Sequence, residues 1–189
     1  MTSTHKAARE GSTERGFSLL ETIFATAVLL VGLVGVAQLV PASLLLNQSN
    51  RTNSSALVVV QHELEILIHQ PLNGPFSTLY TDPVTGNQYS LGDPTQPSGT
   101  LVGSPAAMVN GRTAIDFSQV PVAGYSLNFT DTSDPTAATW DLRWAVIAST
   151  VTTPGGTTVV MSKRFIVGAR QINGQGFVLP VTLDTTVYK

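Results

Sequence analysis

A single carboxylate interrupts a long apolar stretch near the start of the sequence. Glu21 is the only charged residue between Phe17 and Leu46. A carboxylate is costly at the centre of a bilayer, and those that occur in membrane helices are usually paired and functional. Glu21 lies about one helical turn after the start of the apolar stretch, near a membrane–water interface, where the cost is smaller. Glu21 is therefore the first candidate for a functional residue.

Two further groups contain histidine, glutamate or aspartate, whose side chains can bind metal ions. His62, Glu65 and His69 gather on one side of a helical pattern, but their i, i+3, i+7 spacing differs from the HExxH motif. We expect this group to be a solvated stripe. The second group consists of aspartates in Gly-, Thr- and Ser-containing loops without EF-hand spacing, for which calcium binding is a minor alternative: Asp82, Asp93, Asp131 and Asp134.

The sequence contains no recognisable catalytic motif. It has no cysteine, no GxSxG motif, no glycine loop of the kind that cradles phosphates and no plausible acid/base pair. Trp140 and Trp144 share one face of a strand pattern, and we expect them in the core rather than in a sugar-binding platform. We therefore expect no enzyme, no cofactor and no metal site.

The composition favours a chain that is partly shielded from water. Its 189 residues allow one domain plus an appended segment. Charged residues make up 12%, about half the usual share in soluble domains, which fits a chain that lies partly in lipid or against partners. The net charge of −2 and the absence of a Lys/Arg cluster argue against nucleic acid as a direct partner.

A membrane-length apolar stretch follows a polar leader. Residues 1–16 lack apolar periodicity, and their Lys and Arg residues place the N-terminus in the cytoplasm by the positive-inside rule. The helix expected from Phe17 to Leu46 would span about 45 Å, against a hydrocarbon core of about 30 Å. A secretory signal fits poorly, because the apolar stretch is too long and the small residue Gly16 precedes it instead of following it.

The helical pattern continues beyond the apolar stretch to about residue 70. We expect the helix to be bent or frayed at Pro41 and again near Asn47–Asn53, where helix formers are scarce. Residues 56–69 show a second, amphipathic pattern, which ends before Pro71 because proline disfavours helix in its predecessor. One face of this part could lie against a sheet: Leu57, Val60, Leu64, Leu67 and Ile68.

From residue 71 onward the sequence predicts β-structure. Residues 71–112 carry many turn signals and predict an irregular, looped region. Apolar and polar residues alternate at 125–129 and at 140–146, and a Pro-Gly-Gly turn and a return run at 158–169 complete a long antiparallel hairpin. A final strand at 177–187 contains Pro180, which argues for an edge position or a bulge.

The start of the apolar helix resembles the cleavage site of type IV prepilins. It reads Arg15-Gly16-Phe17-Ser18-Leu19-Leu20-Glu21, so that a basic, polar leader ends in Gly and is followed by Phe, three mostly apolar residues, Glu and an apolar helix. The resemblance implies an α+β fold, in which a long N-terminal membrane-spanning helix packs on an antiparallel β-sheet. Residues 1–16 would be a cleaved leader, 17–70 the helix and 71–189 a β-rich globular domain.

The resemblance also implies roles for individual residues. Prepilin peptidase would cut between Gly16 and Phe17, and the new amine of Phe17 would be N-methylated. In a filament the helices would form an apolar bundle, where an unpaired Glu21 is strongly unfavourable. The amine of a neighbouring Phe17 would pair with Glu21 and fix the axial register. The alternative is that Glu21 merely snorkels to the headgroups.

Two glycines and a proline weaken the apolar helix. Each glycine costs about 1 kcal/mol and an interior proline about 3 kcal/mol. In the family the region of Gly32, Gly35 and Pro41 can lose helicity in filaments, whereas the alternative is that small residues only permit close helix contact. Three segments resemble those of PilV-type minor pilins: the Gly-Leu-Val-Gly run, the Trp-rich strand and the Lys163–Val167 strand. No cysteine pair closes a C-terminal loop, unlike in many major pilins.

The sequence therefore favours a minor subunit of a type IV pilus. The resemblance implies other pilin subunits, prepilin peptidase, an inner-membrane assembly platform and membrane lipid as partners. The chain would span the inner membrane once and then enter a cell-surface or periplasmic filament. The alternatives are a pseudopilin of a type II secretion system, which shares this mechanism, and a membrane-anchored extracytoplasmic binding module, which would keep its first residues.

Overall fold

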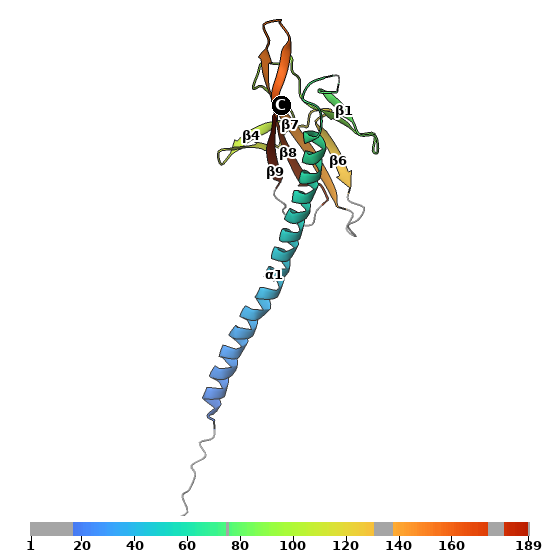
Figure 1. Ribbon diagram of the computed structural model, residues 1–189. Coiled ribbons are helices and arrows are strands. Elements are labelled where there is room, and N and C mark those ends of the chain that lie inside the picture. The colour runs from blue at the N-terminus through green and yellow to red at the C-terminus, as the bar shows by residue number, and fades with distance from the viewer. Residues whose placement is uncertain (1–16, 75, 131–137, 174–179, 189) are drawn as a thin grey trace, which may run out of the picture. The chain divides into compact units, whose positions relative to one another are not determined.

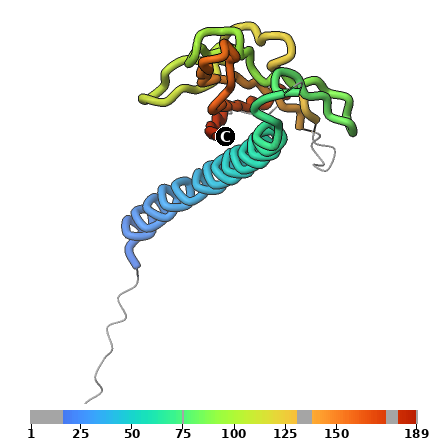
Figure 2. Tube along the Cα trace, turned by 45° about the horizontal axis from the view of Figure 1, so that its top comes forward, coloured from blue at the N-terminus to red at the C-terminus, as the bar shows by residue number. Residues whose placement is uncertain are grey.

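The structure is a computed structural model that describes residues 17–74, 76–130, 138–173 and 180–188. Within these ranges the chain forms one helix, α1, and nine strands, β1 to β9 (Figures 1 and 2). The fold is α+β, as predicted. The chain divides into two compact units, residues 1–46 and 47–189. The predicted leader, with Gly16, lies outside the described residues.

Helix α1 runs from Leu19 to Ile68 without a break. Of the predicted bending or fraying at Pro41 and at Asn47–Asn53, the fraying is wrong, because both stretches are helical, and the bending stays a prediction. Proline removes one backbone donor at a cost of about 3 kcal/mol. Ending the helix at Pro41 would instead leave a full turn of carbonyl and amide groups without partners amid apolar side chains, which costs more.

The polar segment Asn47–Ser55 stays helical although its residues are poor helix formers. Two of its hydroxyl groups donate to carbonyl oxygens four residues back: Thr52 Oγ1 to Gln48 at 3.0 Å and Ser54 Oγ to Asn50 at 2.9 Å. Such bonds satisfy the side chains inside the helix. Each of these residue types costs only a few tenths of a kcal/mol relative to alanine, which is less than the cost of starting a new helix.

The part of α1 beyond Asn47 buries one face. The predicted face was right for Val60 and Leu67, which are buried, and for Leu64 and Ile68, which are partly buried and pack against the core. It was wrong for Leu57, which is 38% exposed. The face is rotated, and it takes in a carboxylate that lies between apolar residues at helical spacing. Its buried residues are Ala56, Val59, Val60, Glu63 and Leu67.

The main sheet has five antiparallel strands. Strands β7 (Thr139–Thr152) and β8 (Thr158–Gln171) form the predicted long hairpin. Among the described strands, β9 (Val181–Tyr188) pairs with β8 alone and is an edge strand, as Pro180 just before it suggested. On the other side β7 pairs with both β3 (Leu101–Gly103) and β6 (Ser126–Thr130).

The prediction of an irregular region at 71–112 was only partly right, because four short strands begin and end within it. Strands β1 (Leu79–Thr81) and β2 (Gln88–Ser90) form a small hairpin. The third is β3, and the fourth is β4 (Ala106–Val109), which pairs with β5 (Arg112–Ile115). Strands of three or four residues are too short to show an alternating pattern, and turn residues dominate the sequence around them.

The core lies on both faces of the main sheet. On one face the buried side of α1 joins the aromatic side chains of β2, β7 and β8 in a single cluster, in which Trp140 and Trp144 are each 1% exposed. This confirms their predicted place in the core. On the other face Ile115 and Phe117 pack against Ala145 and Ile166. Helix and sheet thus share one hydrophobic core within residues 47–189.

An asparagine side chain closes part of the edge of β8. Asn73 follows α1, and its Nδ2 donates to the carbonyl oxygen of Val160 at 2.9 Å while its Oδ1 accepts from the Val160 amide at 2.8 Å. Pairing with β9 begins two residues further on, at Ser162. Asn73 therefore takes the place of a neighbouring strand at this position.

The second face depends on a strand position without a side chain. A Cβ atom at Gly168 would lie 2.9 Å from the Ile115 Cβ and 3.1 Å from the Phe117 ring, closer than such atoms approach one another. Gly168 therefore lets β5 and the following segment pack directly on β8.

We predict that Gly168→Ala lowers the free energy of unfolding by about 1–3 kcal/mol, because the added methyl group overpacks a close contact. The measurement is urea unfolding of the full chain in detergent, followed by near-ultraviolet circular dichroism of the buried tryptophans. Gly155→Ala is the matched control, since the nearest atom to its Cβ lies 3.9 Å away, at Thr153. Equal stability of the two variants would contradict the packing argument.

Candidate site at the start of the apolar helix

Ser18 begins helix α1 as its cap. Its Oγ accepts a hydrogen bond from the amide of Glu21 at 3.2 Å, and its carbonyl oxygen accepts from the amides of Glu21 and Thr22 at 3.0 and 3.2 Å. This Ser-x-x-Glu spacing is that of a capping box, in which an acidic residue in the first turn also faces the positive end of the helix dipole. The helix start at this point is thus encoded locally.

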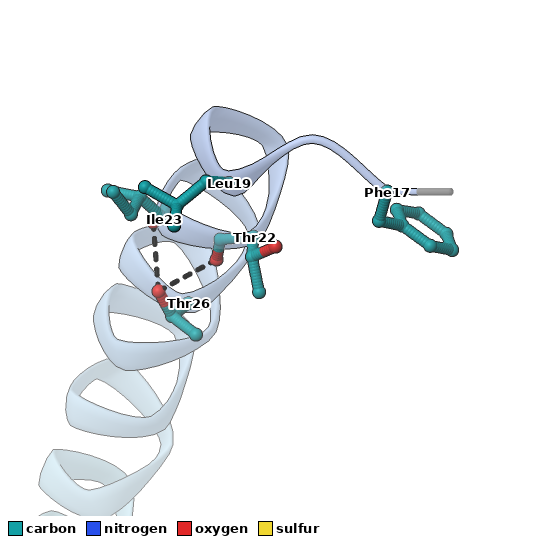
Figure 3. Close-up of a pocket in the computed structure, with 5 residues that line it drawn as sticks. All are labelled: Phe17, Leu19, Thr22, Ile23 and Thr26. Atoms are coloured by element: carbon teal, nitrogen blue, oxygen red, sulfur yellow. Dashed lines mark hydrogen bonds between the residues drawn. The ribbon is translucent and has the colours of Figure 1, made fainter. Parts of the chain in front are cut away.

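The hydroxyl groups near Glu21 are satisfied within the helix. Thr22 Oγ1 donates to the Ser18 carbonyl at 3.1 Å, and Thr26 Oγ1 lies 2.9 Å from the carbonyls of both Thr22 and Ile23 (Figure 3). Threonines bonded in this way need no polar partner outside the helix. Glu21 is exposed, and no described residue forms an ion pair with it. Its carboxylate is therefore the group in the first two turns that needs an external partner in apolar surroundings.

Phe17 lies just before the helix and is 85% exposed. Together with Leu19, Thr22, Ile23 and Thr26 it lines an open pocket on the first turns of α1 (Figure 3). The structure therefore places Phe17 and Glu21 within one turn of each other along the chain and leaves both accessible. Gly16, the other residue of the predicted cleavage site, lies outside the described residues.

The rest of the apolar stretch is exposed along its whole length. Every residue from 17 to 46 is exposed, and the helix is long and apolar enough to cross a membrane. Nothing lies within 4 Å of a Cβ built on Gly32 or Gly35, so this chain itself does not require their small size. Pro41 is accommodated inside the helix. Both predicted roles of these residues, flexibility and close contact with another helix, remain predictions.

The weaker candidates that lie within the described ranges do not come together into a metal site. His62, Glu65 and His69 are exposed, as expected of a solvated stripe. Across the described ranges no group of three His, Asp or Glu side chains could hold a metal ion. Asp82 and Asp93 accept hydrogen bonds from residues of their own turns, which lower the pKa of both carboxyl groups. Two other predicted calcium ligands, Asp131 and Asp134, lie outside the described residues.

Sequence reasoning missed a buried carboxylate, Glu63. It is 4% exposed, and its Oε2 is the one buried side-chain oxygen or nitrogen in the described part of the chain that has no hydrogen-bond partner. Burial raises its pKa, while the side chains of Tyr89 and His62 act in the opposite direction. The available signal was its position: Glu63 follows Val59 and Val60 and precedes Leu67 at the i+3 and i+4 spacing of a buried face.

A buried ammonium group, Lys163 on β8, was also missed as a candidate. It is 1% exposed, and its Nζ donates to the carbonyl oxygen of Ser77. Burial lowers the pKa of Lys163 to about 8. The signal for it is weak, because Lys163 stands in a strand where a polar residue would ordinarily face water.

The buried charges of Asp141 and Arg143 form a cluster with the half-exposed Arg170 on the second face of the sheet. The Arg143 guanidinium donates three hydrogen bonds to Asp141, at 2.8, 3.0 and 3.1 Å, and a fourth to the Gln119 carbonyl. Arg170 donates to the same carboxylate at 3.0 Å. Both guanidinium groups also lie about 5 Å from the Phe117 ring, at 5.0 and 5.2 Å from its centre. Because its charges are paired, this cluster fixes the fold and offers no free group.

Comparison with models of protein families, with curated proteins and with solved structures finds no match to this chain.

We predict that Lys163 makes the stability of the protein depend on pH above about 8. The pKa of Lys163 is about 8 in the folded chain and 10.5 ordinarily. The unfolded chain therefore binds more protons in this window, so that stability rises with pH through it. Lys163→Met should lose this rise, measured as the unfolding midpoint of the full chain in detergent at several pH values. The exposed Arg112→Met is the control and should keep it; equal pH profiles of Lys163→Met and the unaltered chain would refute the assignment.

Proposed function

We propose that this chain is a pilin-like subunit of the type IV prepilin kind, most similar to a minor pilin of a type IV pilus. In this proposal it is inserted in the inner membrane, trimmed by prepilin peptidase and assembled through its N-terminal helix. The observation that carries the proposal is the Gly16-Phe17 junction followed by Glu21, placed at the very start of a helix long enough to cross a membrane.

The exposed apolar helix supports the proposal on physical grounds. Large apolar side chains at its start and along its length are exposed, among them Leu20 at 66% and Leu30 at 62%. Soluble monomers rarely expose apolar patches of more than a few hundred Å². The helix therefore needs lipid or other helices around it, and a pilin-like subunit uses both in turn, first in the membrane and then in a filament.

Trimming would create the partner that Glu21 needs. Leaving lipid for an apolar helix bundle strips Glu21 of interfacial water, and an unpaired charge in such surroundings is strongly unfavourable. Cleavage after Gly16 would turn the amide nitrogen of Phe17 into a cationic amine. The amine of one subunit would then pair with Glu21 of its neighbour. Since the Ser18 cap leaves the carboxylate exposed, Glu21 is accessible for this pairing.

The proposal places the β-rich domain outside the cytoplasmic membrane. The Lys and Arg residues of the leader precede the apolar stretch, which favours a cytoplasmic N-terminus. Other pilin subunits, the peptidase, the assembly platform and membrane lipid are the partners of this route. A pseudopilin of a type II secretion system would follow the same route into a shorter filament.

We predict that the working form of the protein lacks residues 1–16 and carries a methylated Phe17. The measurement is the intact mass of protein extracted from membranes of a host with prepilin peptidase. Gly16→Ala should leave mostly uncut precursor, since the residue before the scissile bond is altered. If the unaltered chain retains its first residues, it is a permanently anchored binding module instead.

We predict that Glu21→Val subunits are inserted and cut but are absent from filaments. The valine has no charge to pair with the neighbouring amine, while the apolar helix itself is unimpaired. The measurement is the amount of this subunit in purified filaments relative to membranes, by immunoblotting. Thr22→Val is the matched control, because the Thr22 hydroxyl bonds only within its own helix. Normal incorporation of Glu21→Val would refute the pairing.

A further inference from the structure

The buried carboxylate of Glu63 lies between α1 and the β1–β2 hairpin. Figures 1 and 2 show this hairpin beside the C-terminal end of the helix. The Tyr89 side chain of β2 is a hydrogen-bonding neighbour of Glu63, and Tyr89 itself is 2% exposed. The hairpin thus covers Glu63 and separates it from water.

An ionised Glu63 is poorly compensated in this position. Its Oε2 has no hydrogen-bond partner, and the His62 Nδ1 atom lies 3.8 Å from the other carboxylate oxygen on an imidazole that is itself largely exposed. A buried charge needs several partners to offset the loss of water, whereas a protonated carboxyl group needs far less. The closed arrangement therefore fits the neutral form of Glu63.

We propose that protonation of Glu63 holds the β1–β2 hairpin closed over α1, and that loss of this proton opens the hairpin while the main sheet stays intact. Water would then reach the carboxylate. The device is built into the fold of residues 47–189 and is independent of the function proposed above.

The hairpin is the element that can open, because its hydrogen bonds to the rest of the fold are concentrated at its base. The Tyr89 ring of β2 also packs on Trp144, with ring centres 5.3 Å apart, and moves off it when the hairpin opens. Its strands have three residues each and pair with each other apart from the main sheet. The Ser90 amide donates to Gly124 at 2.9 Å, the Leu91 amide to Thr78 at 2.8 Å, and Trp144 Nε1 to the Ser90 carbonyl at 2.9 Å. These bonds fix the base. At the tip, Asp82 and Thr85 bond to their own turn.

The charged groups around Glu63 set the direction of the response. The hydrogen bond with Tyr89 and the neighbouring His62 on its own helix both favour the ionised form, whereas Asp82 on the turn between β1 and β2 disfavours it. Burial is the largest influence and raises the pKa of Glu63. The folded chain therefore binds the proton more tightly than the unfolded one. Its contribution to stability is complete at low pH and is lost as pH rises through the folded pKa.

The test is hydrogen exchange of the full chain in detergent, read by mass spectrometry between about pH 4 and about pH 8 and corrected for intrinsic exchange rates. We expect protection of the peptide covering residues 79–91 to fall about tenfold for each unit by which the folded pKa exceeds the unfolded one. A peptide from β7 and β8 serves as the internal reference and should keep its protection. Equal loss in both peptides would mean global unfolding and would overturn the proposal.

Two glutamine variants isolate the carboxylate. Glu63→Gln keeps the shape of the side chain but cannot ionise, so that protection of the hairpin should no longer depend on pH. Glu65→Gln removes an exposed carboxylate two residues away and should respond as the unaltered chain does. A pH dependence that persists in Glu63→Gln would overturn the proposal.

A second measurement needs no variant that could misfold. The sequence contains five glutamates, at positions 10, 14, 21, 63 and 65, so that labelling with ¹³C-glutamate gives few carboxyl signals. One signal should titrate above the ordinary range of a glutamate carboxyl group, in step with the change in exchange of residues 79–91. Titration of every glutamate at the ordinary pH would overturn the proposal.

Discussion

The apolar helix between residues 17 and 46 cannot remain exposed to water. The way in which it is covered constrains the rest of the molecule. Burying a leucine or isoleucine side chain is worth about 1.5–3 kcal/mol, and this stretch exposes such side chains on every face. No described part of the chain covers them, so lipid or other helices must. Under that constraint a lone carboxylate at position 21 carries more weight than any charge elsewhere. In the proposed filament, a neighbouring subunit that supplies a cation would gain a strong interaction with Glu21, and one that does not would leave an unpaired charge in an apolar bundle.

The two faces of the main sheet differ in how their buried charged groups are paired. On one face of the sheet Asp141, Arg143 and Arg170 satisfy one another and tie the segment around Phe117 to β7 and β8. On the other face Glu63 and Lys163 are buried without an ion pair to each other. The opposite charges of the cluster offset one another, whereas burial raises the pKa of Glu63 and lowers that of Lys163. The face that carries α1 is therefore the responsive one.

The sequence predicted the structure well where a regular pattern of apolar residues or a turn motif determines an element without help from tertiary packing. The alternation from Trp140 to Val146 and its Pro-Gly-Gly turn predicted the long hairpin, and the apolar stretch predicted the helix. The buried face of residues 56–69 was harder to predict. One choice of face includes Leu57 and another includes Glu63, and in the structure Leu57 is exposed while Glu63 is buried. Only packing against the sheet selects between these faces. Continuity of the helix through Pro41 likewise follows from cooperativity rather than from local propensity.

The side chain of Asn73 has a consequence for how copies of the protein coexist at high density. An unpaired strand edge is a template on which another chain can build, and proteins held side by side at a surface meet such edges often. The amide of Asn73 occupies the donor and the acceptor of Val160, just where β9 ends. It leaves an approaching strand no free backbone groups at that residue. One short polar side chain thus discourages fibrillar growth along β8 without adding any charge to the surface.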